Sequence, residues 1–132
     1  MTRAFANIMK KNNYSKIINI ASVYGLVENT AMDAVAYHTS KSGVVNITRA
    51  FSAELAKYNI TCNAIWPGYF HTEITAATLD TNAFTQYMKA TVPAGRYGKE
   101  GELNSVALFL GAAESSYVTG VILPVDGGYT CI

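Results

Sequence analysis

Two short stretches of the chain decide the fold: NIASVYG (residues 19–25) and AYHTSKSG (residues 36–43). The first closes a β-rich run, and Ser22 stands where that run stops. The second opens a long helical pattern, so Tyr37 and Lys41, four residues apart, project from one helix face. A strand, a loop and a helix in this order predict polar groups gathered at the carboxyl end of the strand.

Strands and helical patterns alternate along the rest of the chain. The strands are expected at residues 16–22, 60–66 and 121–125. Helical connections between them predict three parallel, adjacent strands with flanking helices and right-handed crossovers. The fold class is therefore α/β, with fewer strands than the six or so of a doubly wound fold. The expected helices are residues 2–11, 37–57, 80–90 and 100–113.

Each expected helix has an apolar face, read from spacings of three and four residues. On the long helix this face comprises Val44, Ile47, Phe51 and Leu55. On the first helix it comprises Phe5, Ile8 and Met9. Asp80 is the expected N-cap of the third helix, whose apolar face carries Phe84, Tyr87 and Met88.

Composition narrows the class of protein. Half of the 132 residues are hydrophobic and 14% are charged, which is typical of a globular protein. A net charge of +1 argues against a nucleic-acid partner, and no stretch approaches the ~20 apolar residues of a membrane span. Two cysteines and two histidines offer no ligand spacing for a metal. We expect reduced thiols and a cytoplasmic location.

Tyr37, Lys41 and Ser22 are the candidate chemical groups. An ammonium close to a phenol favours the phenolate, so Lys41 would help Tyr37 to exchange a proton with an alcohol or ketone. The hydroxyl of Ser22 can donate to the same substrate oxygen. A tyrosine and a lysine at this spacing also occur on solvated helix faces, and a serine after a strand is a common turn residue. The joint arrangement of all three favours acid–base chemistry.

These stretches resemble the signature of the short-chain dehydrogenases/reductases, a serine followed by tyrosine-x-x-x-lysine. The resemblance continues in family order over nearly the whole chain, through NAIWPGYFHTEIT (63–75), VPAGRYG (92–98), ALFL (107–110) and YVTGVILPVDGG (117–128). It implies the C-terminal part of a doubly wound Rossmann-type fold and an enzyme that transfers hydride between NAD(P) and a secondary alcohol or ketone.

The resemblance also implies a role for each matching residue. Ser22 would polarise the substrate carbonyl, Tyr37 would be the catalytic acid/base, and Lys41 would tune Tyr37 and hold the nicotinamide ribose. The residues implied in cofactor binding are Tyr37, Lys41, Pro67, Gly68, Phe70 and Thr72. Residues 74–92 correspond to a lid over the substrate. Within the family, SVYGL, PGYFHTEIT and the stretch from GRYGKEGEL to VDGGYT are most similar to gluconate 5-dehydrogenase-type members, which act on gluconate or 5-ketogluconate.

The glycine-rich turn that holds the pyrophosphate in this family has no counterpart in residues 1–132. The chain is therefore expected to be the C-terminal catalytic portion of the domain, without its N-terminal dinucleotide-binding half. The choice between NAD and NADP stays open, and the full-length parent is expected to be a homo-oligomer acting on a small molecule. An alternative is a truncated fragment, catalytically inactive, that only associates with other chains.

Overall fold

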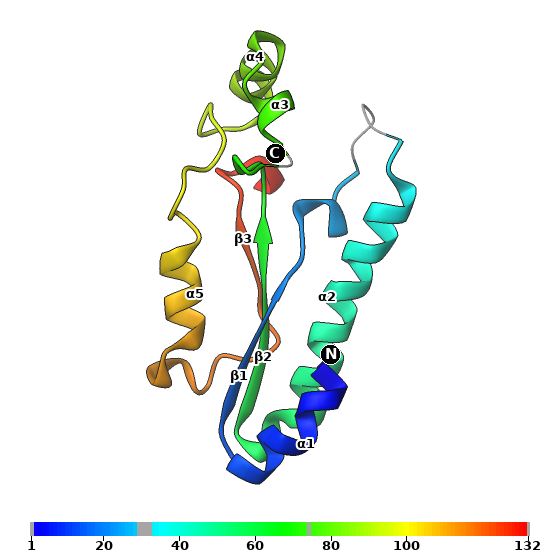
Figure 1. Cartoon of the computed structure of the whole chain (residues 1–132), viewed down its shortest axis with the longest axis vertical. Helices are drawn as coiled ribbons and strands as arrows, with labels where there is room; N and C mark the ends of the chain where they lie inside the picture. The colour runs from blue at the N-terminus through cyan, green and yellow to red at the C-terminus, as the bar shows by residue number, and fades with distance from the viewer. Residues whose placement is uncertain (1, 29–32, 74, 132) are drawn as a thin grey trace.

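The computed structural model describes residues 2–28, 33–73 and 75–131 (Figure 1). Its strands are β1 (Ser15–Ile20), β2 (Ile60–Pro67) and β3 (Ile122–Val125). Its α-helices are α1 (Thr2–Asn12), α2 (Val35–Leu55), α3 (Ala76–Leu79), α4 (Asn82–Thr91) and α5 (Asn104–Gly111). Short 3-10 turns are η1 (Val23–Gly25), η2 (Ala56–Tyr58), η3 (Ala113–Ser115) and η4 (Tyr129–Cys131). Each expected strand and helix is present, with bounds that differ by a few residues.

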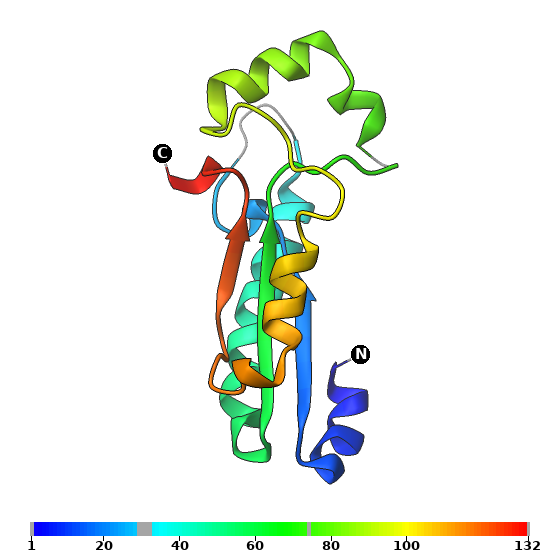
Figure 2. The same cartoon turned by 90° about the vertical axis from the view of Figure 1, so that its left-hand side faces the viewer.

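The three strands form one parallel sheet in the order β1-β2-β3, as predicted. Ser15 pairs with Ile60 at the start of the first ladder, and Ala64 pairs with Ile122 at the start of the second. Helix α2 covers one face of the sheet and α5 covers the other, while α3 and α4 lie beyond the carboxyl ends of the strands (Figures 1 and 2). The strand ends therefore open toward these two helices.

The core between α2 and the sheet corrects one prediction. Leu55 is fully buried and packs with residues of β1 and β2, but Ile47 is 49% exposed. Thr48 and Ser52 are buried on α2 in its place. With 3.6 residues per turn, positions 44, 48, 52 and 55 share a face, and position 47 lies off it. Thr48 tolerates burial because its hydroxyl donates to the Val44 carbonyl at 2.7 Å.

Three further expectations need correction. On α1, Phe5 and Ile8 are half or more exposed, and Ala6 and Met9 make the contact with the core. The N-cap of α4 is Thr81, not Asp80, because Thr81 has extended backbone and its Oγ1 accepts from Phe84 N at 3.2 Å. Helix α5 begins at Asn104 rather than at residue 100.

Buried polar groups join β2 to the segment before β3. Asn63 is fully buried; its Nδ2 donates to the Val118 carbonyl at 2.9 Å, and its Oδ1 accepts from Val121 N at 3.1 Å. Thr119 Oγ1 accepts from Cys62 N at 3.0 Å. Burial also raises the pKa of the Cys62 thiol to about 11, against the opposing effect of a hydrogen bond from Asn19. This thiol therefore stays protonated near neutral pH.

The helices of the described residues are all too short or too polar to cross a lipid bilayer.

Candidate active site

Ser22 lies directly beyond the carboxyl end of β1. The ladder extends one step past the strand, since Ala21 N donates to the Ile65 carbonyl at 2.9 Å. Ser22 is 7% exposed and caps η1, where its Oγ accepts from Tyr24 N at 3.3 Å. The sheet therefore fixes the position of this hydroxyl, as the sequence predicted.

Tyr37 and Lys41 lie in the first turns of α2, on the side that faces the end of β1. The Lys41 ammonium lies 5.5 Å from the centroid of the Tyr37 ring and donates to the Ile20 carbonyl at 3.3 Å. Tyr37 is 46% exposed, so its ring is open to a ligand. Lys41 thus connects the helix to the strand end and keeps a positive charge beside the phenol.

Tight backbone packing holds η1 against α2. A Cβ at Gly25 would lie 3.0 Å from the backbone carbon and oxygen of Lys41, so glycine permits this approach. Ser42 Oγ also donates to the Gly25 carbonyl at 3.0 Å. The turn that carries Ser22 and the helix that carries Tyr37 are therefore held at a set distance.

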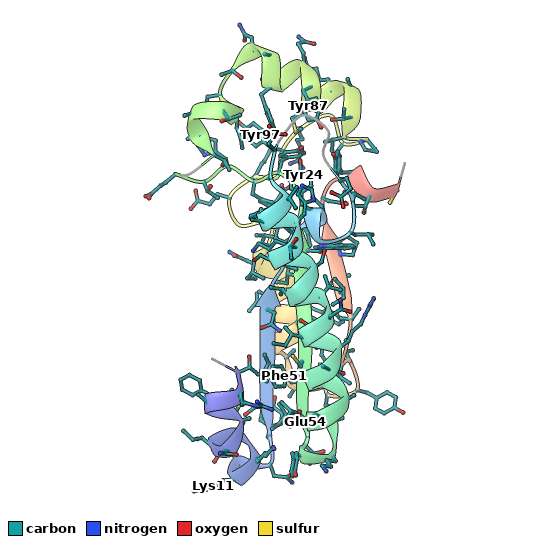
Figure 3. The ribbon with its side chains drawn as sticks, turned by 90° about the vertical axis from the view of Figure 1, so that its right-hand side faces the viewer. Lys11, Tyr24, Phe51, Glu54, Tyr87 and Tyr97 are labelled. Carbon is teal, nitrogen blue, oxygen red and sulfur yellow. The ribbon has the colours of Figure 1, made fainter. Side chains whose placement is uncertain are left out.

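Tyr24, two residues after Ser22, links this group to Tyr69 and through it to α4. Its ring lies 6.5 Å from the Tyr37 ring and 5.1 Å from the His38 ring, measured between centroids. Its hydroxyl shares a hydrogen bond with the hydroxyl of Tyr69. Tyr24 and Tyr87 both lie at the end of the molecule where α3 and α4 are, and Phe51 and Glu54 lie toward the other end of α2 (Figure 3).

Tyr69 is the centre of an aromatic cluster. Its ring makes edge contacts, at centroid distances of 5.3 to 6.2 Å, with rings from the η1 turn, α4 and η4: Tyr24, Phe84, Tyr87 and Tyr129. Its hydroxyl lies 3.5 Å from the Tyr87 hydroxyl. We call Tyr24, Tyr69, Tyr87 and Tyr129 the tyrosine cluster.

The pKa values of the phenols in the tyrosine cluster are shifted in different directions. Burial, together with hydrogen bonds to Tyr24 and Tyr87, holds the pKa of Tyr69 well above its usual range. Burial acts to raise the pKa of Tyr87, and hydrogen bonds to Tyr69, Tyr129 and Thr91 together lower it below its usual value. Tyr69 therefore remains a neutral hydroxyl, able to donate and to accept, throughout the physiological pH range.

Strand β2 ends at Pro67, and Gly68 follows it beside the end of β3. Gly68 N donates to the Val125 carbonyl at 3.0 Å, and a Cβ at Gly68 would lie 2.8 Å from Cα and Cβ of Asp126. The Asp126 carboxylate accepts from Gly128 N and from the amide and hydroxyl of Thr130. Glycine at position 68 therefore allows the ends of β2 and β3 to close together, with a turn fixed by Asp126 beside them.

Phe70 and Thr72 follow this turn in the segment that leads to α3. Phe70 forms a parallel bridge with Gly98, and a Cβ at Gly98 would lie 2.3 Å from the Phe70 ring. The Phe70 carbonyl accepts from Thr75 Oγ1 at 2.8 Å. Thr72 is exposed, and its hydroxyl shares a 2.9 Å hydrogen bond with the Thr75 hydroxyl.

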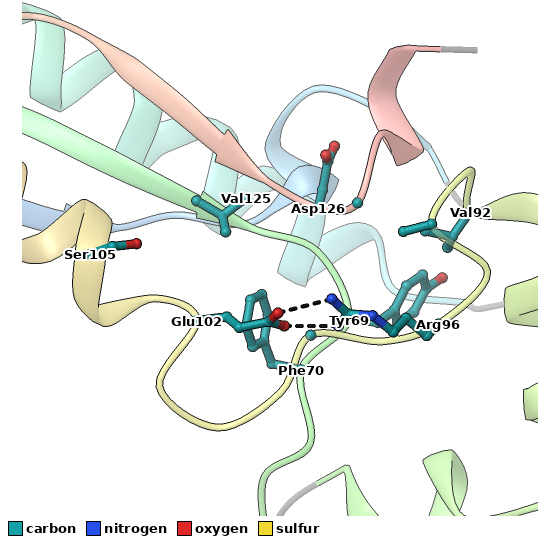
Figure 4. Close-up of a pocket in the computed structure, with 11 residues that line it drawn as sticks. Tyr69, Phe70, Val92, Arg96, Glu102, Ser105, Val125 and Asp126 are labelled. Carbon is teal, nitrogen blue, oxygen red and sulfur yellow. Dashed lines mark hydrogen bonds and ion pairs between the residues drawn. The ribbon is translucent and has the colours of Figure 1, made fainter.

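A cavity of about 360 Å³ lies on the β3 side of this segment (Figure 4). Its lining includes Tyr69, Phe70 and Asp126, together with the ion pair Arg96–Glu102 at 2.8 Å. Hydrogen bonds from Arg96 and from the Lys99 amide lower the pKa of Glu102 to about 2. The three predicted chemical groups, Ser22, Tyr37 and Lys41, lie outside the lining of this cavity.

The tyrosine cluster was not predicted from the sequence. Two of its members stand next to predicted residues, since Tyr24 follows Ser22 by two positions and Tyr69 follows Pro67-Gly68 directly. That proximity is the only signal the sequence carries, because the cluster is assembled from four separate segments. Among the described residues, no group of three or more histidine, cysteine or acidic side chains is placed to hold a metal ion.

Known proteins are similar to this chain over nearly its whole length. A family model described as "Enoyl-(Acyl carrier protein) reductase" matches residues 1–130. Galactitol 2-dehydrogenase (L-tagatose-forming) of Cereibacter sphaeroides is 39% identical over 129 residues, which are 98% of this chain and 51% of that protein. 5-Keto-D-gluconate 5-reductase of Escherichia coli K12 is 38% identical over 128 residues, 97% of this chain and 50% of that protein.

Solved structures give the same result. A gluconate 5-dehydrogenase from Burkholderia cenocepacia J2315, in complex with NADP and tartrate, superposes with a TM-score of 0.93 at 37% identity. The match covers 99% of this chain and 51% of that one, so the chain spans about half the length of the relatives it matches. By sequence, fold and motif, the chain belongs to the short-chain dehydrogenase/reductase family.

Proposed function

We propose that residues 1–132 are the C-terminal catalytic portion of a dehydrogenase that interconverts a secondary alcohol and a ketone with NAD or NADP. One observation carries the proposal. The Lys41 ammonium lies between the Tyr37 ring and the Ile20 carbonyl, at the strand end where Ser22 is buried. A fixed positive charge beside an accessible phenol suits that phenol to transfer protons.

The three side chains would then divide the work on the substrate oxygen. In reduction, Ser22 donates a hydrogen bond to the carbonyl and Tyr37 gives it a proton; in oxidation, Tyr37 takes the proton of the alcohol. Lys41 stabilises the phenolate that is left after reduction. Holding these groups at the end of one strand and the start of one helix orients them before the substrate arrives.

The residues present fit the nicotinamide end of a dinucleotide. The absence of a side chain at Gly68 lets the ends of β2 and β3 approach each other, with Asp126 in the space that a Cβ would take. Pro67, Gly68, Phe70 and Thr72 would contact the ring and its carboxamide, and Lys41 and Tyr37 would contact the ribose. The dinucleotide, when bound, supplies or accepts the hydride. NADP is present in the solved gluconate 5-dehydrogenase structure, and the choice for this protein stays open.

The rest of the domain, with the glycine-rich turn for the pyrophosphate, would lie outside residues 1–132. This part of the proposal is supported by the match to about half of each relative's length. Without that turn, the isolated chain is expected to be inactive. A sugar acid such as gluconate or 5-ketogluconate is the proposed substrate, and the full-length protein is expected to be a cytoplasmic homo-oligomer.

A spectrophotometric assay of the full-length protein tests this function. With NAD or NADP and a panel of sugar acids, polyols and simple secondary alcohols, at least one pair should change absorbance near 340 nm. Lys41→Ala should reduce both turnover and cofactor affinity. Lys57 is exposed and lies in η2, directly after the C-terminal end of α2. Lys57→Ala is therefore the matched control and should behave as wild type. A Lys41→Ala protein as active as the control would refute the assignment.

A further inference from the structure

We propose that Tyr69, with Tyr24 behind it, selects substrates that carry hydroxyl groups beside the reacting carbon. The inference rests on the proposed function and adds the residues that would determine its substrate class. The matched relatives differ in what their names say they act on, from galactitol and 5-keto-D-gluconate to cyclopentanol and 3-oxoacyl groups. Some side chains near the reacting groups must therefore discriminate between a polyhydroxylated substrate and an apolar one.

Position is the first argument. Tyr24 contacts Tyr37 edge to face and shares a hydrogen bond with Tyr69, so only one ring separates the Tyr69 hydroxyl from the proposed acid/base. Tyr69 also directly follows the Pro67-Gly68 turn, where the nicotinamide is proposed to lie. A substrate held between Tyr37 and that turn would meet the phenols of Tyr24 and Tyr69 first.

Chemistry is the second argument. The tyrosine cluster presents four phenols on aromatic walls, and a phenol oxygen that is already paired can still accept or donate another hydrogen bond. Tyr69 stays neutral, so it can pair with a hydroxyl without the cost of burying a charge. A polyhydroxylated substrate would add hydrogen bonds to these oxygens, whereas an apolar substrate would add none.

The nature of the neighbouring cavity is the third argument. Tyr69 also lines the cavity of about 360 Å³, where Arg96, Glu102 and Asp126 add charged and hydrogen-bonding groups. A pocket for an acyl chain is expected to be mainly apolar. Phe70, Val92 and Val125 also line this cavity, so its wall combines apolar surface with these polar groups, as a site for a polyhydroxylated carbon chain would.

The test compares Tyr69→Phe with wild type in the full-length protein. This substitution keeps the ring and its aromatic contacts and removes one oxygen. The probes are D-gluconate and galactitol as polyhydroxylated substrates and cyclopentanol as a substrate with one hydroxyl. The ratio of kcat/KM for the polyhydroxylated substrate to kcat/KM for cyclopentanol should fall about 10-fold or more, as loss of one hydrogen bond to a substrate hydroxyl predicts. Tyr24→Phe should shift the ratio in the same direction.

Tyr117→Phe is the control, because Tyr117 is fully exposed and distant from the cluster, and its ratio should match wild type. Equal losses of kcat/KM on both kinds of substrate would overturn the inference, since a residue that only holds the lid would harm both alike. An unchanged ratio would overturn it as well.

Titration calorimetry provides a readout that does not need turnover. Gluconate or galactitol should bind Tyr69→Phe about 10-fold more weakly than wild type in the presence of cofactor. A wild-type protein that oxidises cyclopentanol but binds neither polyhydroxylated probe would overturn this inference and leave the proposed function standing. A protein that binds a polyhydroxylated probe through Tyr69 but turns over nothing would support this inference and overturn the proposed function.

Discussion

The two ends of β2 use polar side chains in opposite ways. Near its amino end, Asn63 is fully buried and bonded to backbone groups on both sides of Thr119. At its carboxyl end, Tyr69 and Phe70 are partly exposed, and the hydroxyl of Tyr69 bonds to the side-chain hydroxyls of Tyr24 in η1 and Tyr87 in α4. One strand therefore carries a structural polar network and a candidate binding surface.

The two networks differ in whether a ligand can replace one of their hydrogen-bond partners. The Asn63 network joins a fully buried side chain to the backbone of Val118 and Val121, so a ligand cannot take its place. The tyrosine cluster consists of side-chain hydroxyls, and its member Tyr69 lines a cavity, so a substrate hydroxyl can replace a partner of Tyr69. Substitutions at the amino end should therefore act on stability, and those at the carboxyl end on substrate or cofactor.

The largest effect on stability is expected from Asn63→Leu. This variant keeps most of the volume but leaves the Val118 carbonyl and the Val121 amide without their partners. Each unpaired buried group costs about 1–3 kcal/mol, so the full-length protein should lose about 2–4 kcal/mol in urea denaturation. Asn46→Ala, at an exposed position of α2, is the control and should change stability by less than about 0.5 kcal/mol. A loss of activity in Asn63→Leu well below its melting temperature would break the contrast between the two ends.

A smaller effect, at the carboxyl end, is expected from Gly98→Ala. The new Cβ would lie 2.3 Å from the Phe70 ring, which must turn away and move the segment after Pro67-Gly68. The KM for the cofactor should rise about 10-fold, which corresponds to about 1.4 kcal/mol, with little change in urea stability. Gly111→Ala, where nothing lies within 4 Å of the new Cβ, is the control. A cofactor KM equal to that of the control would show that this segment does not touch the dinucleotide.

The smallest effect is expected from Glu102→Gln. The Arg96 hydrogen bonds lower the pKa of this carboxyl from 4.5 to about 2, so its contribution to stability is present above pH 4.5 and is lost as pH falls toward 2. The Tm of the variant should be slightly below that of wild type at pH 7, and the two should converge under acid conditions. Because the pair is exposed, the difference should be small. A difference that grew as the pH was lowered would contradict this account.

Much of the fold could be predicted from sequence because the relevant signals are local. Spacing alone placed Tyr37 and Lys41 on one helix face, and the strand end placed Ser22. Residues such as Thr48 could not be found this way, since a hydrophobic pattern passes over a polar side chain that is buried through its own hydrogen bonds. Asp80 was a plausible cap by type, but the backbone reaches extended geometry only at Thr81.

The residues of the candidate site also fall into those with local sequence signals and those without. Residues within a motif could be predicted, whereas the tyrosine cluster depends on four segments that meet only after the sheet and α4 are in place. The motif residues also have packing roles that their spacing in the sequence does not indicate. Gly68 permits the close approach of Asp126, which directly follows β3, and Phe70 fills the space beside Gly98.

The measurement that tests the central claim most directly is the turnover of Tyr37→Phe in the full-length protein. Proton transfer by a positioned side chain is worth ~10²–10⁴-fold, so kcat should fall by that factor. Cofactor affinity, measured by binding of the reduced dinucleotide, should change little because Lys41 remains. Tyr14→Phe, at an exposed tyrosine before β1, should keep wild-type turnover. A Tyr37→Phe protein with turnover near that of wild type would contradict the account.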